Sequence, residues 1–214
     1  MGVLERRARE KEALRSKILE AATSLFVEQG YENVSIRKIA DRIEYSPATI
    51  YLYFKDKAEL ITAICEDAFG EMLEQIGAAK DGASDPVQSL RLGLRCYIQF
   101  GLSHPNHYLI IFATQAYDGT DATCKPNGLA MQTFDLLRDS IRSCIQVGAI
   151  PPSDVETAAQ ATWMTVHGVT MLGIAAGNQS CDNFPWLDRT HLIESALDVI
   201  IAGLRNCTLP PPVR

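Results

Sequence analysis

The fold is decided by residues 35–57, which read SIRKIADRIEYSPATIYLYFKDK. Ser35 is a good N-cap, because its hydroxyl can accept a hydrogen bond from a backbone N–H of the first helical turn. Apolar residues then recur at helical spacing through 36–43, so this helix has one apolar side. Ser46 is a second N-cap, and Pro47 falls at the first position of the next helix, where its missing N–H costs nothing.

Two short helices separated by a turn at residues 44–45 predict a helix-turn-helix, an element that binds DNA. The second helix, residues 46–53, is about two turns long and rich in hydroxyl groups, which suits insertion into a major groove. Arg37 and Thr49 are the side chains predicted to reach base edges. The residues predicted to contact phosphates are Ser35, Ser46, Tyr51, Tyr53 and Lys57, and Pro47 completes the predicted DNA-binding set.

The run from Ser46 to Leu60, SPATIYLYFKDKAEL, closely resembles the DNA-binding signature of the tetracycline-repressor-like (TetR/AcrR) regulators. The resemblance implies an all-helical homodimer with an N-terminal DNA-binding domain and a C-terminal domain for effector binding and dimerisation. The chain departs from the family at Glu44, where the family usually has glycine. A left-handed conformation would cost Glu44 about 1 kcal/mol, so we expect this turn to be slightly reshaped.

Composition indicates a soluble globular protein. Of 214 residues, 47% are hydrophobic, and no apolar run approaches the ~20 residues that a membrane span needs. The first fifteen residues are charged throughout, unlike a secretory signal. The six cysteines, at positions 65, 96, 124, 144, 181 and 207, form no closely spaced pair, which favours reduced thiols in a cytoplasmic protein.

Charge and helix patterns divide the chain into a DNA-binding domain at 1–57, an effector-binding and dimerisation domain at 58–207, and a tail at 208–214. The first domain carries 11 basic and 9 acidic residues, and the remainder carries 9 and 17. Only the surface that docks on DNA must be positive, so the net charge of −6 does not exclude DNA binding.

Helical periodicity and end signals predict the elements in order. Residues 1–10 are expected to be a frayed, charged lead-in, whose Arg6, Arg7 and Arg9 are either solvated or in contact with DNA. The helices are predicted at about 11–29, 36–43, 46–53, 56–76, 86–103, from 105, 128–147, 154–177 and 188–205, with loops at 77–85, 117–127 and 178–187.

The last two predicted helices could pair with their copies from a second chain as a four-helix bundle. The alternative is that their apolar stripes only fill the core of one chain. The residues predicted for the dimer interface are Ala158, Ala159, Thr162, Ile193, Leu197, Ile200, Ile201 and Leu204. Trp163 with His167–Gly168 also resembles the C-terminal domain of one TetR subgroup, which carries a tryptophan followed by a His-Gly pair.

An effector pocket is predicted among the middle helices, where aromatic and sulfur-containing side chains collect. Its predicted lining is Phe69, Tyr97, Phe100, His104, Tyr108, Phe112, Trp163, Met164, His167 and Met171, although any one such residue is more often part of the plain core than of a pocket wall. His104 and His107 have no Cys, Asp or Glu ligand near them in sequence, so no metal or other cofactor is predicted.

Together these patterns predict a homodimeric, ligand-responsive DNA-binding regulator. We expect a repressor that a small apolar or amphipathic effector releases from a pseudo-palindromic double-stranded DNA operator. No nucleophile, base and orienting group are spaced as in an enzyme, so catalysis is not predicted. Two alternatives stay open: a thiol-based redox-sensing regulator, and a helical ligand-binding or enzymatic protein with a vestigial DNA-binding head.

Overall fold

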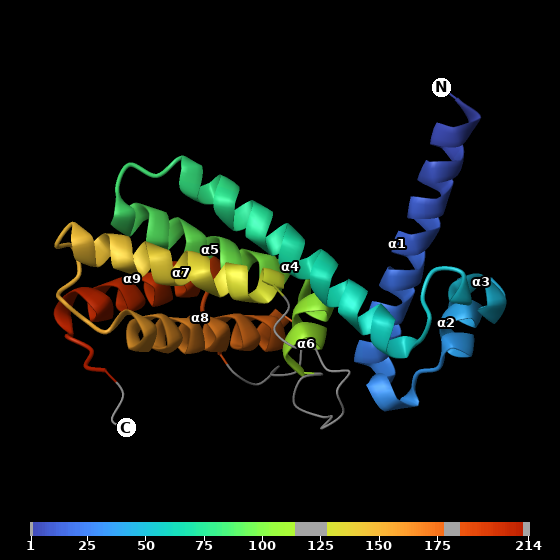
Figure 1. Ribbon diagram of the computed structural model, residues 1–214. Helices are drawn as coiled ribbons and strands as arrows, with labels where there is room; N and C mark the ends of the chain where they lie inside the picture. Colours follow the sequence, from blue (N-terminus) through green and yellow to red (C-terminus); the bar gives the residue numbers. More distant parts are fainter. Residues whose placement is uncertain (1, 114–127, 178–184, 212–214) are drawn as a thin grey trace. The chain divides into compact units, whose positions relative to one another are not determined.

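The computed structural model describes residues 2–113, 128–177 and 185–211, and within these ranges the regular structure is entirely helical (Figure 1). The predicted all-α fold is therefore confirmed. The α-helices are α1 (Val3–Gln29), α2 (Ile36–Arg42), α3 (Pro47–Tyr51), α4 (Lys57–Asp81), α5 (Pro86–Ser103), α6 (Pro105–Ala113), α7 (Gly128–Gln146), α8 (Val155–Gly177) and α9 (Arg189–Asn206). The predicted loop at 117–127 and most of the one at 178–187 lie outside the described residues.

The described residues form two compact units. The first unit holds residues 2–68 and 106–113, and the second holds 69–105, 128–177 and 185–211. The helix α4 is continuous through the boundary, so one helix contributes to both units. The first domain was predicted to end at residue 57, where the shared helix begins, and this boundary stays a prediction.

The core of the first unit joins the helix-turn-helix to α1 and to the start of α4. Helix α1 packs against α2, and α2 packs against α3 (Figure 1). The side chains buried at its centre are Ile18, Ala22, Leu25, Ile39, Ile50 and Leu60. Because Ile50 is the buried residue of the short α3, it fixes that helix against the rest of the unit.

The second unit is a bundle centred on α5. This helix packs against α7, α8 and α9, and α8 also packs against α7 and α9. A Cβ at Gly173 would lie 2.9 Å from Leu102 Cδ2, so the missing side chain lets α8 approach α5 closely. Side chains buried in this bundle include Leu90, Leu94, Ile98, Ile141, Val166 and Leu197.

Two predicted helix boundaries are wrong. Helix α1 begins at Val3 rather than near residue 11, so the lead-in is helical. Its Arg, Ala, Glu and Lys residues are good helix formers, and the Arg6–Glu10 ion pair spans one helical turn. Helix α4 continues past Gly77 to Asp81, because Lys80 in its last turn is held by α7.

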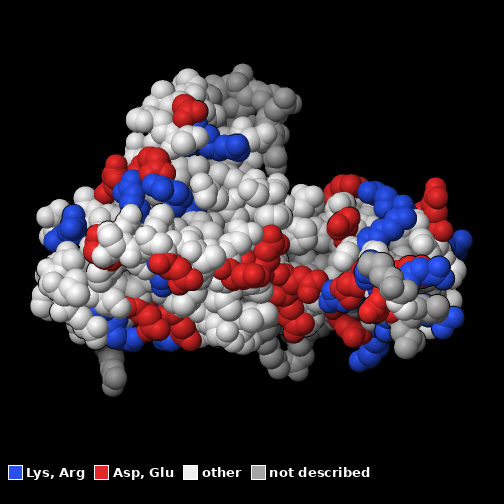
Figure 2. Space-filling view, turned by 90° about the horizontal axis from the view of Figure 1, so that it is seen from above, with Lys and Arg blue, Asp and Glu red and all other residues white. Residues whose placement is uncertain are grey.

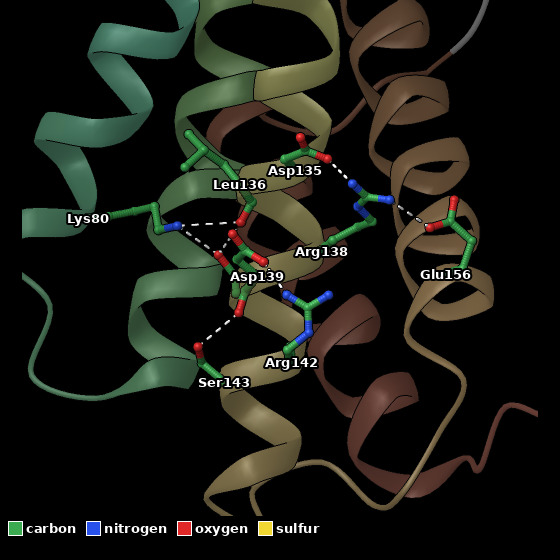
Figure 3. A network of polar contacts seen from close by, with 9 residues as sticks. Lys80, Asp135, Leu136, Arg138, Asp139, Arg142, Ser143 and Glu156 are labelled. Carbon is green, nitrogen blue, oxygen red and sulfur yellow. Dashed lines mark hydrogen bonds and ion pairs between the residues drawn. The ribbon is translucent and has the colours of Figure 1, made fainter.

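That last turn of α4 belongs to a polar network (Figure 3). Lys80 Nζ donates to Ser140 Oγ at 2.8 Å and to the Leu136 carbonyl at 3.5 Å. Burial lowers the pKa of Lys80. On the other side of α7, Arg138 Nη1 lies 3.2 Å from Glu156 Oε2 in the first turn of α8. The network therefore fastens one end of α4 and one end of α8 to the same helix.

The residues predicted for the dimer interface pack inside the single chain. Ile193 is half-buried, and the buried members are Ala158, Ala159, Thr162, Leu197, Ile200, Ile201 and Leu204. A side chain without exposed surface has none left to bury against a partner. The seven buried residues thus contribute to the core of the second unit, the exposed faces of α8 and α9 carry other side chains, and a role of these residues in a dimer stays a prediction.

Within the described ranges, none of the helices combines the length and the apolar character that crossing a bilayer requires.

Candidate nucleic-acid interface and ligand-binding unit

Helix α3 is held by its own cap and by one buried anchor. Ser46 Oγ accepts a hydrogen bond from Thr49 N at 3.2 Å, and Pro47 occupies the first turn. Ile50 points inward with no exposed surface, whereas Tyr51 is 56% exposed. The helix is thus fixed on one side and presents its remaining side chains to solvent, which is the arrangement that a recognition helix needs.

The hydroxyl groups of Ser46 and Thr49 lie 3.0 Å apart and hydrogen-bond to each other. Thr49 is the predicted reader of a base edge and is half-buried, and its neighbour Tyr53 is also half-buried. A base or phosphate would therefore compete with an existing side-chain hydrogen bond for the Thr49 hydroxyl.

The first turn of α2 is capped in the same way. Ser35 Oγ accepts a hydrogen bond from Lys38 N at 3.3 Å. Arg37 is exposed on this turn. Lys38 is engaged elsewhere, because its ammonium donates to Gln29 Oε1 at 2.8 Å and to the Asn33 carbonyl at 2.9 Å. The structure thus leaves Arg37, one of the two predicted base readers, extended from a rigid turn.

The turn between α2 and α3 keeps the left-handed conformation, contrary to our expectation of a reshaped turn. Glu44 has φ of 62°. The strain is offset by the turn's contacts: Tyr45 N donates to the Ala40 carbonyl at 2.9 Å, and Lys17 Nζ donates to the Ile43 carbonyl at 3.4 Å. Lys17 on α1 thereby satisfies a carbonyl at the end of α2, where a positive charge is favourable.

Lys57, predicted to contact a phosphate, is tied to the rest of the first unit. Its ammonium donates to the Tyr31 carbonyl at 2.6 Å and lies 3.9 Å from the centre of the Tyr31 ring. An ammonium group has three N–H donors, so this arrangement positions the charge and leaves capacity for an anion. The same turn is capped by Asp56, whose Oδ1 accepts from Glu59 N at 2.9 Å.

Exposed acidic side chains form a band along α4 (Figure 2). They include Glu66, Asp67, Glu71 and Glu74. This band repels the phosphate backbone, so DNA is disfavoured along this face of the helix.

In the second unit, four of the aromatic side chains on α5, α7 and α8 form one cluster. Trp163 Nε1 donates to the Tyr97 hydroxyl at 3.2 Å, and its ring lies edge-on to Phe134, with centroids 6.3 Å apart. The His167 ring follows at 5.9 Å from Trp163. Burial lowers the pKa of His167, so its neutral form is favoured at pH 7. The cluster combines aromatic surface with a few polar atoms, as small-molecule sites do.

The other residues predicted for the effector pocket are distributed differently. His104 stacks on Phe100 at 4.8 Å, and its Nε2 lies 3.7 Å from Glu71 Oε1. Phe69 is buried, Met171 is half-buried, and Met164 is 69% exposed. Tyr108 and Phe112 belong to the first unit, where their rings lie 4.7 Å apart.

Sequence reasoning missed Phe134 and Glu71 as neighbours of these rings. Phe134 carried a signal, since it opens the apolar stripe of its own helix, but nothing in the sequence placed that stripe against Trp163.

Among the described residues, no group of three or more His, Cys, Asp or Glu side chains lies close enough together to hold a metal ion.

A capped, half-exposed recognition helix in a helix-turn-helix, followed by a second helical unit, is the arrangement of a helix-turn-helix transcription regulator. The chain belongs to the TetR family. The model of "Bacterial regulatory proteins, tetR family" matches residues 18–64, and that of "Tetracyclin repressor-like, C-terminal domain" matches residues 90–200. The finer subgroup resemblance at Trp163 and His167 stays a prediction.

Relatives extend over most of the chain. It is 25% identical over 194 residues to the fatty acid metabolism regulator protein of Bacillus subtilis (strain 168), which covers 89% of this chain and 95% of that protein. It is 27% identical over 150 residues to the HTH-type transcriptional regulator AcrR of Shigella flexneri, with 66% and 69% covered.

The fold is similar to that of FadR from Bacillus subtilis in complex with stearoyl-CoA, at a TM-score of 0.76 and 20% identity, with 88% of this chain and 98% of that chain covered. FadR from Bacillus halodurans, a fatty acid degradation regulator, also has a TM-score of 0.76, at 20% identity, with 89% and 100% covered.

Proposed function

We propose that this chain is a homodimeric repressor that a long-chain fatty acyl-CoA releases from a pseudo-palindromic operator. The observation that carries the proposal is α3, a short capped helix that is anchored by Ile50 and has Ala48 and Tyr51 exposed and Thr49 half-exposed. Each subunit would place α3 in one of two successive major grooves. Arg37 and Thr49 would contact base edges. The phosphates would be contacted by Ser35, Ser46, Tyr51, Tyr53 and Lys57.

Dimerisation through α8 and α9 is supported by their exposed apolar faces. On α8, Met164 and Leu172 are 69% and 58% exposed, and on α9 Val199 is 71% exposed. Met164 and Leu172 are eight residues apart and so share one face of their helix, together with the exposed Ala161. Since α8 and α9 pack against each other, these faces can form one four-helix interface with a second copy.

The effector class is supported by the aromatic cluster around Trp163 and by the relatives. One relative is named a fatty acid metabolism regulator, and a protein of the same fold was solved with stearoyl-CoA. An acyl-CoA is amphipathic, with an apolar chain that aromatic surface can cover and a polar head. Binding in the second unit would shift the equilibrium between DNA-competent and incompetent arrangements through α4.

A thiol-based switch is disfavoured at three of the four described cysteines, Cys65, Cys96 and Cys144, whereas the fourth, Cys207, is exposed. Burial raises the pKa of both Cys96 and Cys144, and Cys65 is 1% exposed. A reactive cysteine needs an accessible thiol with a lowered pKa, and burial works against this at Cys65, Cys96 and Cys144.

The test is a gel-shift titration against DNA from upstream of the gene, with and without stearoyl-CoA. Free CoA and stearate serve as controls for the head group and the chain. We expect a complex of two subunits per duplex that stearoyl-CoA dissociates. A complex that persists with stearoyl-CoA contradicts the proposed effector, and the absence of any sequence-specific complex contradicts DNA binding itself.

A further inference from the structure

The first turns of α1 extend from the first unit as an exposed helix. Residues 5–13 are all exposed, and Ile18 is the first fully buried side chain of α1. In Figure 1 this part of α1 reaches beyond α2 and α3, which pack near its other end. Eleven residues of helix, 3–13, span about 16 Å. We call residues 3–13 the α1 extension.

Every carboxylate among residues 5–13 has a partner. Glu5 Oε2 accepts from Gly2 N at 3.0 Å, Glu10 pairs with Arg6 at 3.4 Å, and Glu12 pairs with Arg15 at 3.7 Å. Two of these three negative charges, those of Glu10 and Glu12, are therefore paired with cations, and Glu5 is held by a neutral backbone N–H.

Two cations of the α1 extension are not compensated. Arg7 and Lys11 have no ion pair or hydrogen bond to any residue that the structure describes. They lie four residues apart, on consecutive turns of one helix face. Other cations of the first unit are already engaged, as Arg15 is with Asp67 at 2.9 Å and Arg42 with Glu28 at 2.8 Å. Only Arg37 of α2 joins Arg7 and Lys11 as an unpaired cation among the described residues of this unit.

The two unpaired cations share a face with the core of the unit. Helical spacing continues from Arg7 and Lys11 through Leu14 to Ile18, Ala22 and Leu25. Because Ile18, Ala22 and Leu25 are the buried side of α1, and α1 packs on α2, Arg7 and Lys11 lie on the side of α1 that carries the helix-turn-helix.

We propose that the α1 extension is a second DNA contact, in which Arg7 and Lys11 bind backbone phosphates in the DNA flanking each half-site. The proposal rests on the proposed DNA-binding function and adds a surface outside the helix-turn-helix. Phosphates are the partner that these residues fit, since exposed cations with no ion pair of their own supply charge and position a protein on DNA without reading its sequence. Binding of a phosphate by Arg7 or Lys11 breaks no ion pair within the protein, whereas binding by Arg15 or Arg42 would break the pair with Asp67 or Glu28.

The test compares the double variant Arg7→Ala/Lys11→Ala with the wild-type full chain on two duplexes. One duplex ends at the outer edges of the two half-sites, and the other extends by about one helical turn at each end. On the long duplex, we expect the variant to bind at least about tenfold more weakly. Its plot of log affinity against log salt should be shallower by about 0.9 for each phosphate that the variant no longer neutralises. On the short duplex, wild type and variant should bind alike.

Arg142→Ala is the control, because Arg142 is an exposed arginine of the second unit that pairs with Asp139 and has no proposed contact with DNA. It should change neither affinity nor salt slope by a comparable amount. Circular dichroism of the double variant checks that its helix content is kept. Equal salt slopes for wild type and double variant overturn the α1 contact, and so does an equal loss of affinity on both duplexes. Failure of the wild type to bind either duplex would instead overturn the proposed function.

Discussion

The two units position their important side chains by different means. In the first unit, the contacts that shape α2 and α3 are local: Ser35 caps Lys38 N and Ser46 caps Thr49 N, each across three residues. In the second unit, Trp163 reaches Tyr97 across 66 residues of sequence, and Lys80 reaches Ser140 across 60. A local cap can be recognised in a sequence, whereas a contact between distant helices exists only after they have packed. The proposed DNA reading and the proposed ligand sensing would thus rest on local contacts in one unit and on contacts between distant helices in the other.

The largest expected losses of stability come from truncating one core side chain in each unit. Ile50 and Ile141 both have no exposed surface. Changing either to alanine should cost about 2–5 kcal/mol of stability, because a cavity remains in a packed core. Hydrogen exchange followed by mass spectrometry should show Ile50→Ala loosening mainly the first unit and Ile141→Ala mainly the second. If either variant increased hydrogen exchange equally in both units, the two units would not be separately stabilised.

A smaller effect is expected from the cap of α3. Ser46→Ala should lower the free energy of unfolding by about 1 kcal/mol, because the hydrogen bond to Thr49 N is removed. Ser46→Asp restores a capping carboxylate but places a negative charge where a phosphate should lie. We expect it to keep the stability in a denaturant titration and to lose operator affinity. An aspartate variant that binds the operator like the wild type would remove Ser46 from the phosphate contacts.

Relieving the strain at Glu44 should raise the free energy of unfolding by an amount similar to, or smaller than, the loss expected for Ser46→Ala. Glu44→Gly should raise the stability of the first unit by about 0.5–1 kcal/mol, since glycine adopts the left-handed conformation without strain but costs more backbone entropy on folding. Glu44→Gln removes the charge and keeps the strain, so its stability should match the wild type. If both substitutions stabilise equally in thermal melts, the charge of Glu44 is the cause and the backbone is not.

The smallest change in stability is expected for Lys80, in the last turn of α4. Burial lowers the pKa of Lys80, so the charged form is disfavoured in the folded chain relative to the unfolded one. Its cost is therefore present below the ordinary lysine pKa of about 10.5 and is relieved as pH rises toward that value. Lys80→Met removes the charge and keeps much of the volume, so the unfolding midpoint at pH 7 should stay or rise slightly. A clear fall would mean that the bond to Ser140 outweighs the cost of burying the charge.

Much of the first unit could be predicted from the sequence because its determinants are close together. Both serine caps, Pro47 and the exposed position of Tyr51 follow from spacing alone. The prediction of a frayed lead-in at residues 1–10 is wrong, because charged side chains such as Arg6 and Glu10 pair along a helix that begins at Val3. The left-handed Glu44 was also mispredicted, because the cost of one strained residue is smaller than the stabilisation from the contacts that hold the turn.

The second unit was predictable only as a set of helices. Their ends follow from caps and prolines, but which face packs on which does not. Ala158 and Leu197, which were expected at a dimer interface, are fully buried within one chain. An apolar stripe in a sequence does not show whether the stripe packs in a core or against a partner. Phe134 contacts Trp163 and Lys80 contacts Ser140, each on another helix. The sequence around Phe134 and Lys80 does not predict these contacts.

Base reading by α3 is tested most directly by Thr49→Ala. The measurement is fluorescence anisotropy at one salt concentration, with the operator and a scrambled duplex of equal length. We predict that the variant binds the operator about fivefold more weakly per half-site and the scrambled duplex unchanged, because it lacks one base interaction of about 1 kcal/mol. An equal loss of affinity on both duplexes, or no loss on either, would contradict a recognition helix at residues 47–51.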